Sequence, residues 1–142
     1  MKKRALPLIT LLAIVGLGLV LPACTAPQLV SPDVLDGTSW VLMAYRKSSP
    51  IEGTTITAAF EDGQVHGSSG CNTYFGSYEV SGNAITVGTL TMTEMACLEP
   101  EGCMDQEMYY LGFLGSGKTF KLSDEQLQIY VDHEALTFVP RE

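Results

Sequence analysis

Basic residues are scarce in this 142-residue chain, which has eight lysines and arginines against sixteen aspartates and glutamates. Three of the eight, Lys2, Lys3 and Arg4, stand at the beginning of the sequence. Beyond them five basic residues face the sixteen acidic ones, a net charge of −11, with no cluster of Lys and Arg that could neutralise phosphates. The composition therefore argues against binding of nucleic acid, or of anionic lipid head groups, through a basic patch.

Several catalytic signatures are also absent. The glycine-rich stretch GSSGCNTYFGSYEV, residues 67–80, contains no lysine and is not followed by a helical pattern, which excludes a phosphate-binding loop. It also lacks the Gly-x-Ser-x-Gly spacing of a nucleophile elbow. Glycines inside strands supply bulges, bends or close backbone approach instead. There is no internal repeat or low-complexity tract, so the chain is expected to form one compact domain.

The N-terminus has the layout of a secretory signal, with three basic residues before an uncharged, mostly aliphatic run over residues 5–23. The run ends in LVLPAC, which resembles a bacterial lipobox. In such signals a peptidase cleaves before a cysteine that carries a diacylglycerol, here Cys24. Pro22 departs from the usual lipobox pattern, and the alternative is an uncleaved membrane helix, for which the run is nearly long enough.

This layout predicts three segments. Residues 1–23 are expected to be a lipoprotein signal peptide, residues 24–34 a flexible tether after the lipidated Cys24, and residues 35–140 the folded domain. The N-terminal positive charges orient the chain so that the rest is exported. We therefore expect a protein anchored to the bacterial cell membrane by its lipidated cysteine.

Most of the remaining sequence consists of short strand patterns separated by turn residues. Asp62-Gly63 and the Ser81–Asn83 stretch are expected to form hairpin turns, and Trp40, Leu42 and Ala44 to face the core from a strand that is largely covered on its other side. The expected strand segments are 38–46, 54–60, 61–67, 76–80, 84–92, 118–122, 126–132 and 135–140.

One segment has helical spacing. Met104, Met108, Leu111 and Leu114 recur on one expected face, and glycines at 115 and 117 should end the helix. Acidic residues near its start, Asp105 and Glu107, suit a helix N-terminus. With no crossover helices for parallel strands, the chain should be mainly β: a small antiparallel barrel or strongly curved sheet capped by one amphipathic helix.

The sequence contains three short motifs: Gly-x-x-Gly-Cys-Asn at 67–72, Met-Ala-Cys at 95–97 and Met-Asp-x-Glu at 104–107. They resemble those of the META domain family, which includes the HslJ-like heat-shock lipoproteins. The LDGTSWVL at 35–42 and the LTF at 136–138 resemble the usual ends of that domain. The resemblance covers residues 35–139. The motif residues, which we expect to be structural, are Gly67, Gly70, Cys71, Asn72, Met95, Ala96, Cys97, Met104, Asp105 and Glu107.

The resemblance implies a lipocalin-like barrel in exported or envelope-anchored proteins, some of them linked to stress and antibiotic tolerance. No catalytic residues or cofactors are established for the family. We therefore expect a non-enzymatic protein with a binding or envelope-stress role, whose partner is an unknown envelope protein. The alternative is a carrier of a lipid or small apolar ligand inside the barrel.

The family resemblance also implies a disulfide between Cys71 and Cys97. An exported domain meets an oxidising compartment, which permits such a bridge. Cys103 is additional to the family pattern, and Cys97 with Cys103 is the competing pair. The spacing of those two, with no nearby histidine, is poor for zinc, so no metal site is expected.

Two further sets of residues have both a chemical and a structural interpretation. His66 or His133 could act as a base for Cys71 or Ser69, and Glu94 with Glu107 as an acid–base pair, but nothing in the sequence fixes their distances. An aromatic and sulfur-rich set could bind apolar ligands, although filling the core is the simpler role. Its members are Tyr74, Phe75, Tyr78, Met92, Met95, Met104, Met108, Tyr109 and Tyr110.

Overall fold

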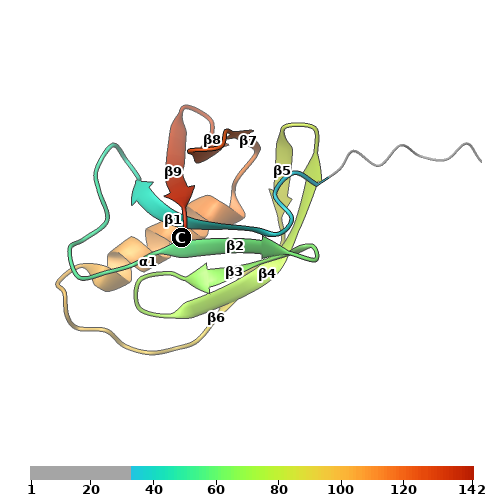
Figure 1. Cartoon of the computed structure of the whole chain (residues 1–142). Helices are drawn as coiled ribbons and strands as arrows, with labels where there is room; N and C mark the ends of the chain where they lie inside the picture. The colour runs from blue at the N-terminus through green and yellow to red at the C-terminus, as the bar shows by residue number, and fades with distance from the viewer. Residues whose placement is uncertain (1–32) are drawn as a thin grey trace, which may run out of the picture.

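The computed structural model describes residues 33–142, which form nine strands and one helix (Figure 1). Every strand pairing among them is antiparallel. The elements are β1 (Thr38–Ala44), β2 (Thr57–Glu61), β3 (Gln64–Ser68), β4 (Thr73–Ser81), β5 (Ala84–Val87), β6 (Thr91–Met92), α1 (Cys103–Gly115), β7 (Thr119–Leu122), β8 (Leu127–Val131) and β9 (Glu134–Pro140).

Eight of these strands close into a barrel. The order β3-β2-β1-β9-β8-β7-β5-β4 returns to its start because β4 also pairs with β3. The short β6 pairs with β4 through Tyr74 and Phe75, on the same edge that β5 uses further along. The prediction of a mainly β, antiparallel barrel with one helix is confirmed.

Two-residue turns build the hairpins, as the sequence predicts. Asp62 and Gly63 have φ values of 49° and 73°, the left-handed conformation that a tight β2–β3 turn requires. Asp132 is likewise left-handed, with φ 53°, between the paired ends of β8 and β9.

The predicted strand over 84–92 is wrong as a single element. It divides into β5 and β6 around Gly88, whose N–H donates to the Ser77 carbonyl at 2.8 Å. A Cβ at position 88 would lie well inside van der Waals contact with the Ser77 hydroxyl oxygen. Beyond Gly88 the pairing with β4 shifts by one residue, from Val87 opposite Tyr78 to Thr91 opposite Phe75. The other face of β1 is also more open than predicted, since Met43 is 52% exposed.

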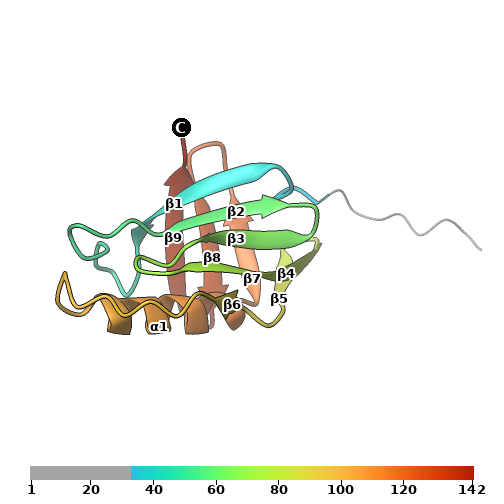
Figure 2. The same ribbon diagram turned by 90° about the horizontal axis from the view of Figure 1, so that it is seen from below.

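The helix α1 lies across one end of the barrel (Figure 2), where it covers the ends of β7, β8 and β9. It ends at Gly115, as predicted, but its predicted buried face is wrong. Of the four predicted positions only Leu114 is buried, and Met108 is 62% exposed. The buried positions are Cys103, Gln106, Glu107, Tyr110, Phe113 and Leu114.

Side chains from the wall and from α1 fill the interior of the barrel. Tyr110 packs edge-on against Tyr74, with ring centroids 5.6 Å apart, and its hydroxyl lies 2.7 Å from that of Tyr74. Phe138 packs against the other side of Tyr110, and Phe60 against Tyr78. Of the aromatic and sulfur-rich set, Tyr74, Tyr78 and Tyr110 belong to the buried core, whereas Phe75, Met95 and Met108 are exposed. Tyr110 rather than Tyr109 is the fully buried one of the two neighbours.

Gly67 is predicted to be intolerant of a side chain. A Cβ there would fall well inside van der Waals contact with the Thr57 carbonyl, because β2 and β3 approach closely at that point. Gly67→Ala should lower the free energy of unfolding by about 3 kcal/mol, measured by chemical denaturation.

The matched control is Gly112→Ala in α1, where a Cβ meets no atom within 4 Å. Removing glycine from a helix interior should raise the free energy of unfolding by about 0.5–1 kcal/mol. Equal effects of the two substitutions would contradict the close approach at Gly67.

Candidate functional site

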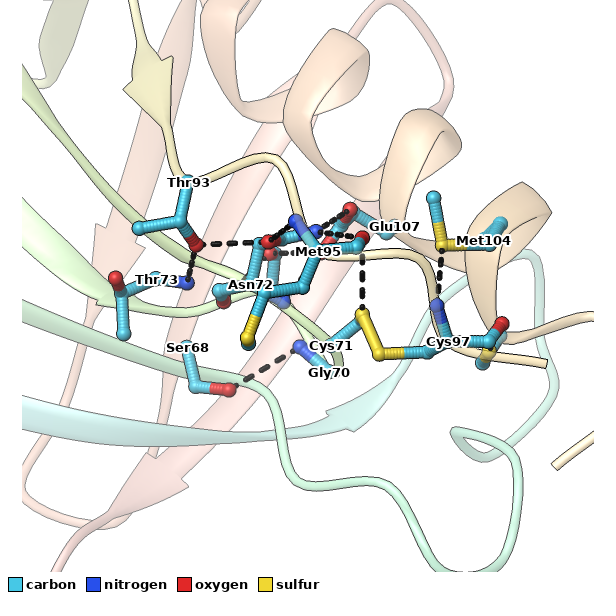
Figure 3. The surroundings of a disulfide bond; sticks show 12 residues. Ser68, Gly70, Cys71, Asn72, Thr73, Thr93, Met95, Cys97, Met104 and Glu107 are labelled. Atoms are coloured by element: carbon cyan, nitrogen blue, oxygen red, sulfur yellow. Dashed lines mark hydrogen bonds between the residues drawn. A yellow bond between two sulfur atoms is a disulfide. The ribbon is translucent and has the colours of Figure 1, made fainter. Parts of the chain in front are cut away.

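The three motifs meet where the β3–β4 connection, the segment after β6 and the first turns of α1 come together (Figure 3). Cys71 and Cys97 form a disulfide there, with Cα atoms 5.9 Å apart and a sequence separation of 26. This is the pairing that the family resemblance implies. It ties the β3–β4 connection to the segment that precedes the helix.

Cys103, the additional cysteine, is a free thiol in the described structure and is 2% exposed. It is the first residue of α1, and its thiol donates to the Cys97 carbonyl at 2.8 Å. The competing pair of Cys97 with Cys103 is therefore not formed.

Glu107 is the buried charge of the site, with none of its surface exposed. Its Oε2 accepts the Asn72 backbone N–H at 2.8 Å and a hydrogen bond from the Ser69 hydroxyl. Its Oε1 accepts the Asn72 side-chain amide at 2.8 Å. Within residues 33–142, Lys118 and Asp132 form the one ion pair, so Glu107 is held by neutral donors.

Asn72 connects this carboxylate to the segment after β6, as Figure 3 shows. Its Oδ1 accepts the Met95 N–H and the Thr93 hydroxyl, both at 2.7 Å. Its amide nitrogen also donates to the Met95 carbonyl at 3.1 Å. Both ends of the Asn72 side chain are thus used, and one residue joins the barrel, the following segment and the helix.

The pKa of Glu107 is lowered overall. Burial alone would raise the pKa, because it removes water from the charged form, but the hydrogen bonds oppose it. The donors are the Ser69 hydroxyl, the Asn72 side chain, and the backbone N–H groups of Asn72 and Cys71. Together they stabilise the carboxylate, so Glu107 is ionised at neutral pH.

The remaining motif residues have more local roles. Met95 and Ala96 are exposed, and Met95 takes part in the site through its backbone. Met104 is half-buried, with its sulfur 3.5 Å from the Cys97 nitrogen. Asp105 lies in the first turn of α1, whereas Glu107 lies beyond it and serves the buried network instead of the helix terminus. Gly70 has φ 109°, a conformation that favours glycine.

Sequence reasoning missed Gln106, which is 3% exposed. Its Oε1 accepts the Ile51 N–H at 2.7 Å and the Tyr45 hydroxyl at 3.2 Å, and its nitrogen donates to the Thr54 hydroxyl at 2.9 Å. It therefore fastens the β1–β2 connection to α1. A glutamine in a helix carries no pattern that could have indicated this role.

Among the candidate catalytic residues the structure joins Ser69 to Glu107, but within residues 33–142 no hydrogen bond joins either histidine to Cys71 or Ser69. Cys71 is in the disulfide, and Ser69 is buried with its hydroxyl hydrogen-bonded to Asn72 and Glu107. His66 is exposed on β3, opposite Phe75 of β4, and Glu94 is exposed in the segment after β6. His133 lines hollows between α1, the β8–β9 hairpin and the end of β1, which differ from the one that His66 lines.

Residues 33–142 contain no group of three or more His, Cys, Asp or Glu side chains arranged to hold a metal ion. None of their helices has the length and apolar character needed to cross a membrane.

Glu107→Gln tests the buried carboxylate. The glutamine amide group would face the Ser69 and Asn72 groups that donate hydrogen bonds to the carboxylate, so donor would meet donor. The free energy of unfolding should therefore fall by about 3 kcal/mol at pH 7. Because the folded pKa is lowered, the ionised group stabilises the fold above the unfolded pKa of about 4.3, and this contribution is lost as pH falls through the folded pKa.

The difference between the two proteins should therefore shrink below about pH 4. Asp105→Asn is the control, an exposed carboxylate two residues earlier whose removal should cost about 0.5 kcal/mol. A Glu107→Gln effect as small as the control effect, or one independent of pH, would contradict this role.

Replacing both Cys71 and Cys97 by serine should lower the free energy of unfolding by about 3.5 kcal/mol, since the bridge restricts the unfolded chain. Non-reducing peptide mapping of the unaltered protein should recover a peptide that joins these two cysteines, and Cys103→Ala should leave it unchanged. Recovery of a peptide joining Cys97 to Cys103 would overturn the assignment.

Comparison with known proteins places this architecture in a family. A family model described as the META domain matches residues 33–142. An NMR structure of a protein from Burkholderia xenovorans is 30% identical, with a TM-score of 0.66 over 85% of this chain and 99% of that one. No curated protein matches the chain.

Two other solved structures show the same fold at lower identity. One, an NMR structure, is 23% identical with a TM-score of 0.63, covering 79% of this chain and 96% of that one. The other, a DUF4847 family protein from Bacteroides vulgatus, is 11% identical with a TM-score of 0.56, covering 77% and 97%. With the family match spanning the whole described barrel, the chain belongs to the META domain family.

Proposed function

We propose that this META-domain protein is exported, is held at the bacterial cell membrane by a lipid on Cys24, and acts by binding rather than by catalysis. Residues 1–32, which include the signal and Cys24, lie outside the described residues. The support for the anchor is the sequence: basic residues, an uncharged run and a lipobox-like LVLPAC.

The observation that carries the proposal is the disulfide between Cys71 and Cys97. Disulfides persist in oxidising compartments and are rare in the cytosol. A disulfide-bonded domain behind a secretory signal is consistent with a function outside the cytoplasm. The link to envelope stress rests on the family alone.

The arrangement of the site favours a non-catalytic role. A general base or nucleophile must reach a substrate, but Glu107 and Ser69 are both 0% exposed and are hydrogen-bonded to each other. The disulfide removes the Cys71 thiol as a nucleophile. The buried cluster around Glu107 and Ser69 thus stabilises the fold of the barrel.

The alternative, a carrier with its ligand inside the barrel, is not favoured by the core. Tyr74, Tyr110, Phe60 and Phe138 occupy the interior and are each at most 2% exposed. A ligand there would have to displace packed aromatic rings. Binding by this protein is better sought on its outer surface.

Metabolic labelling with an alkyne fatty acid tests the anchor in a bacterial host. The unaltered protein should incorporate the label and sediment with membranes, whereas Cys24→Ala should carry no label. Mass spectrometry of the purified protein should find residues 1–23 removed and the new N-terminus acylated.

Cys103→Ala serves as the matched control, because it removes a cysteine that is not expected to carry lipid. An unlabelled protein recovered from the cytosol with all thiols reduced would refute the proposed location.

A further inference from the structure

A hollow of about 490 Å³ lies on the outer surface between the turn that follows β1 and the β8–β9 hairpin. Arg46 and Lys47 line it from the turn, and His133 and Glu134 line it from the hairpin. The turn is short: Tyr45 and Ser48 pair through backbone hydrogen bonds of 2.9 and 2.8 Å. Both cations therefore stand side by side at the two central positions of a tight turn.

The backbone of this turn is strained. Arg46 and Lys47 have φ values of 47° and 63°, where side-chain-bearing residues pay about 1–2 kcal/mol each. Turns of this kind strongly prefer Asn-Gly. Strained residues of this sort occur at ligand-binding sites, where the surroundings hold them in place. Arg46 and Lys47 thus occupy two turn positions whose backbone conformation favours Gly or Asn.

Contacts with the helix hold the turn. The Arg46 guanidinium lies 3.8 Å from the centroid of the Tyr109 ring, and the Tyr45 and Tyr109 rings are 5.5 Å apart. The Tyr109 hydroxyl donates to Glu134 at 3.0 Å. Glu134, the one carboxylate that lines this hollow, thereby accepts a hydrogen bond from a neutral donor.

The charge of the hollow is unusual for this protein. Beyond Arg4 the chain has only five basic residues, and two of them are here. Lys118 forms the one ion pair of residues 33–142, with Asp132, so Arg46 and Lys47 have no carboxylate within ion-pair distance there. The lining of this hollow has two basic residues and one acidic residue, Glu134, within a domain of net charge −11, so an anion would meet less repulsion here than the overall charge implies.

A second hollow, of about 560 Å³, adjoins the first, because His133 and Glu134 line both. Its apolar wall comes from Met108, Phe113 and Val131. Asp132 also lines it, and that carboxylate is paired with Lys118 at 2.8 Å. Met108 is exposed, although the sequence pattern placed it on the buried face of the helix. Together the two hollows offer cations beside an apolar surface, and each falls in the usual range for small-molecule sites.

We propose that these joined hollows bind a small organic anion, a carboxylate or phosphate monoester with a short aliphatic part. The anionic group would lie at Arg46 and Lys47, and the aliphatic part against Met108 and Phe113. This inference goes beyond the anchored role and does not depend on it, because every residue used lies on the barrel and the helix.

The test uses the full chain in nanodiscs of zwitterionic lipid, titrated with hexanoate, hexyl phosphate and hexanol and followed by backbone amide NMR. Hexanoate or hexyl phosphate should shift the amides of Arg46, Lys47, His133 and Glu134 with saturation, and the tighter of the two identifies the preferred anionic group. Hexanol, which lacks the charge, should bind at least tenfold more weakly.

The decisive variant is Arg46→Asn with Lys47→Gly. It removes both cations but gives the turn its preferred sequence, so the protein should fold with an unchanged or higher melting temperature. Anion affinity should fall at least tenfold. Lys121→Gln is the matched control, since it removes a basic residue that lies over Tyr130 instead, and affinity should be retained.

Three results would overturn the proposal: neither anion binds, hexanol binds as tightly as hexanoate, or the double variant keeps the affinity of the unaltered protein. An equal loss in Lys121→Gln would also overturn it, because binding would then follow overall charge and not this site. Failure of the lipid-anchor test would leave this measurement unaffected.

Discussion

The interaction on which the structure depends is the buried carboxylate of Glu107 and its ring of neutral donors. Removing a carboxylate from water costs several kcal/mol, and here no cation offsets the cost. Hydrogen bonds to a charged group contribute about 1.5–3 kcal/mol each. The bonds from Ser69 and Asn72 therefore offset the desolvation cost when all are present, whereas no single one of them is large enough to do so. The arrangement is stable only when it is complete.

The same cluster explains how a helix with a partly polar buried face is held on the barrel. Glu107 joins α1 to the β3–β4 connection, Asn72 continues to Met95, and the disulfide of Cys71 and Cys97 joins the same two segments covalently. The hydrogen bonds act on the folded state, whereas the bridge acts mainly by restricting the unfolded chain. Gln106, one residue before Glu107, fastens the β1–β2 connection in the same way.

The sequence predicted those parts of the fold that are encoded locally. Asp62-Gly63 indicates a tight turn, and short alternating segments without crossover helices indicate an antiparallel barrel or a strongly curved sheet. The phase of α1 could not be predicted, because Gln106 and Glu107 are buried through partners distant in sequence while Met108 is left exposed. The break after Gly88 is a one-residue shift in register against β4, from Val87 opposite Tyr78 to Thr91 opposite Phe75, which depends on tertiary pairing. The Arg46-Lys47 turn contains neither Gly nor Asn, so nothing in the sequence indicates that its backbone is left-handed.

The pKa of the Glu107 carboxyl group tests the central claim most directly. It can be read from the side-chain carboxyl carbon in a ¹³C NMR titration of the folded protein. The account predicts a pKa below the ordinary glutamate value of about 4.3, because four hydrogen bonds favour the charged form. A pKa above the ordinary value would mean that burial outweighs the donors, and would contradict the claim that an ionised Glu107 joins the helix to the barrel.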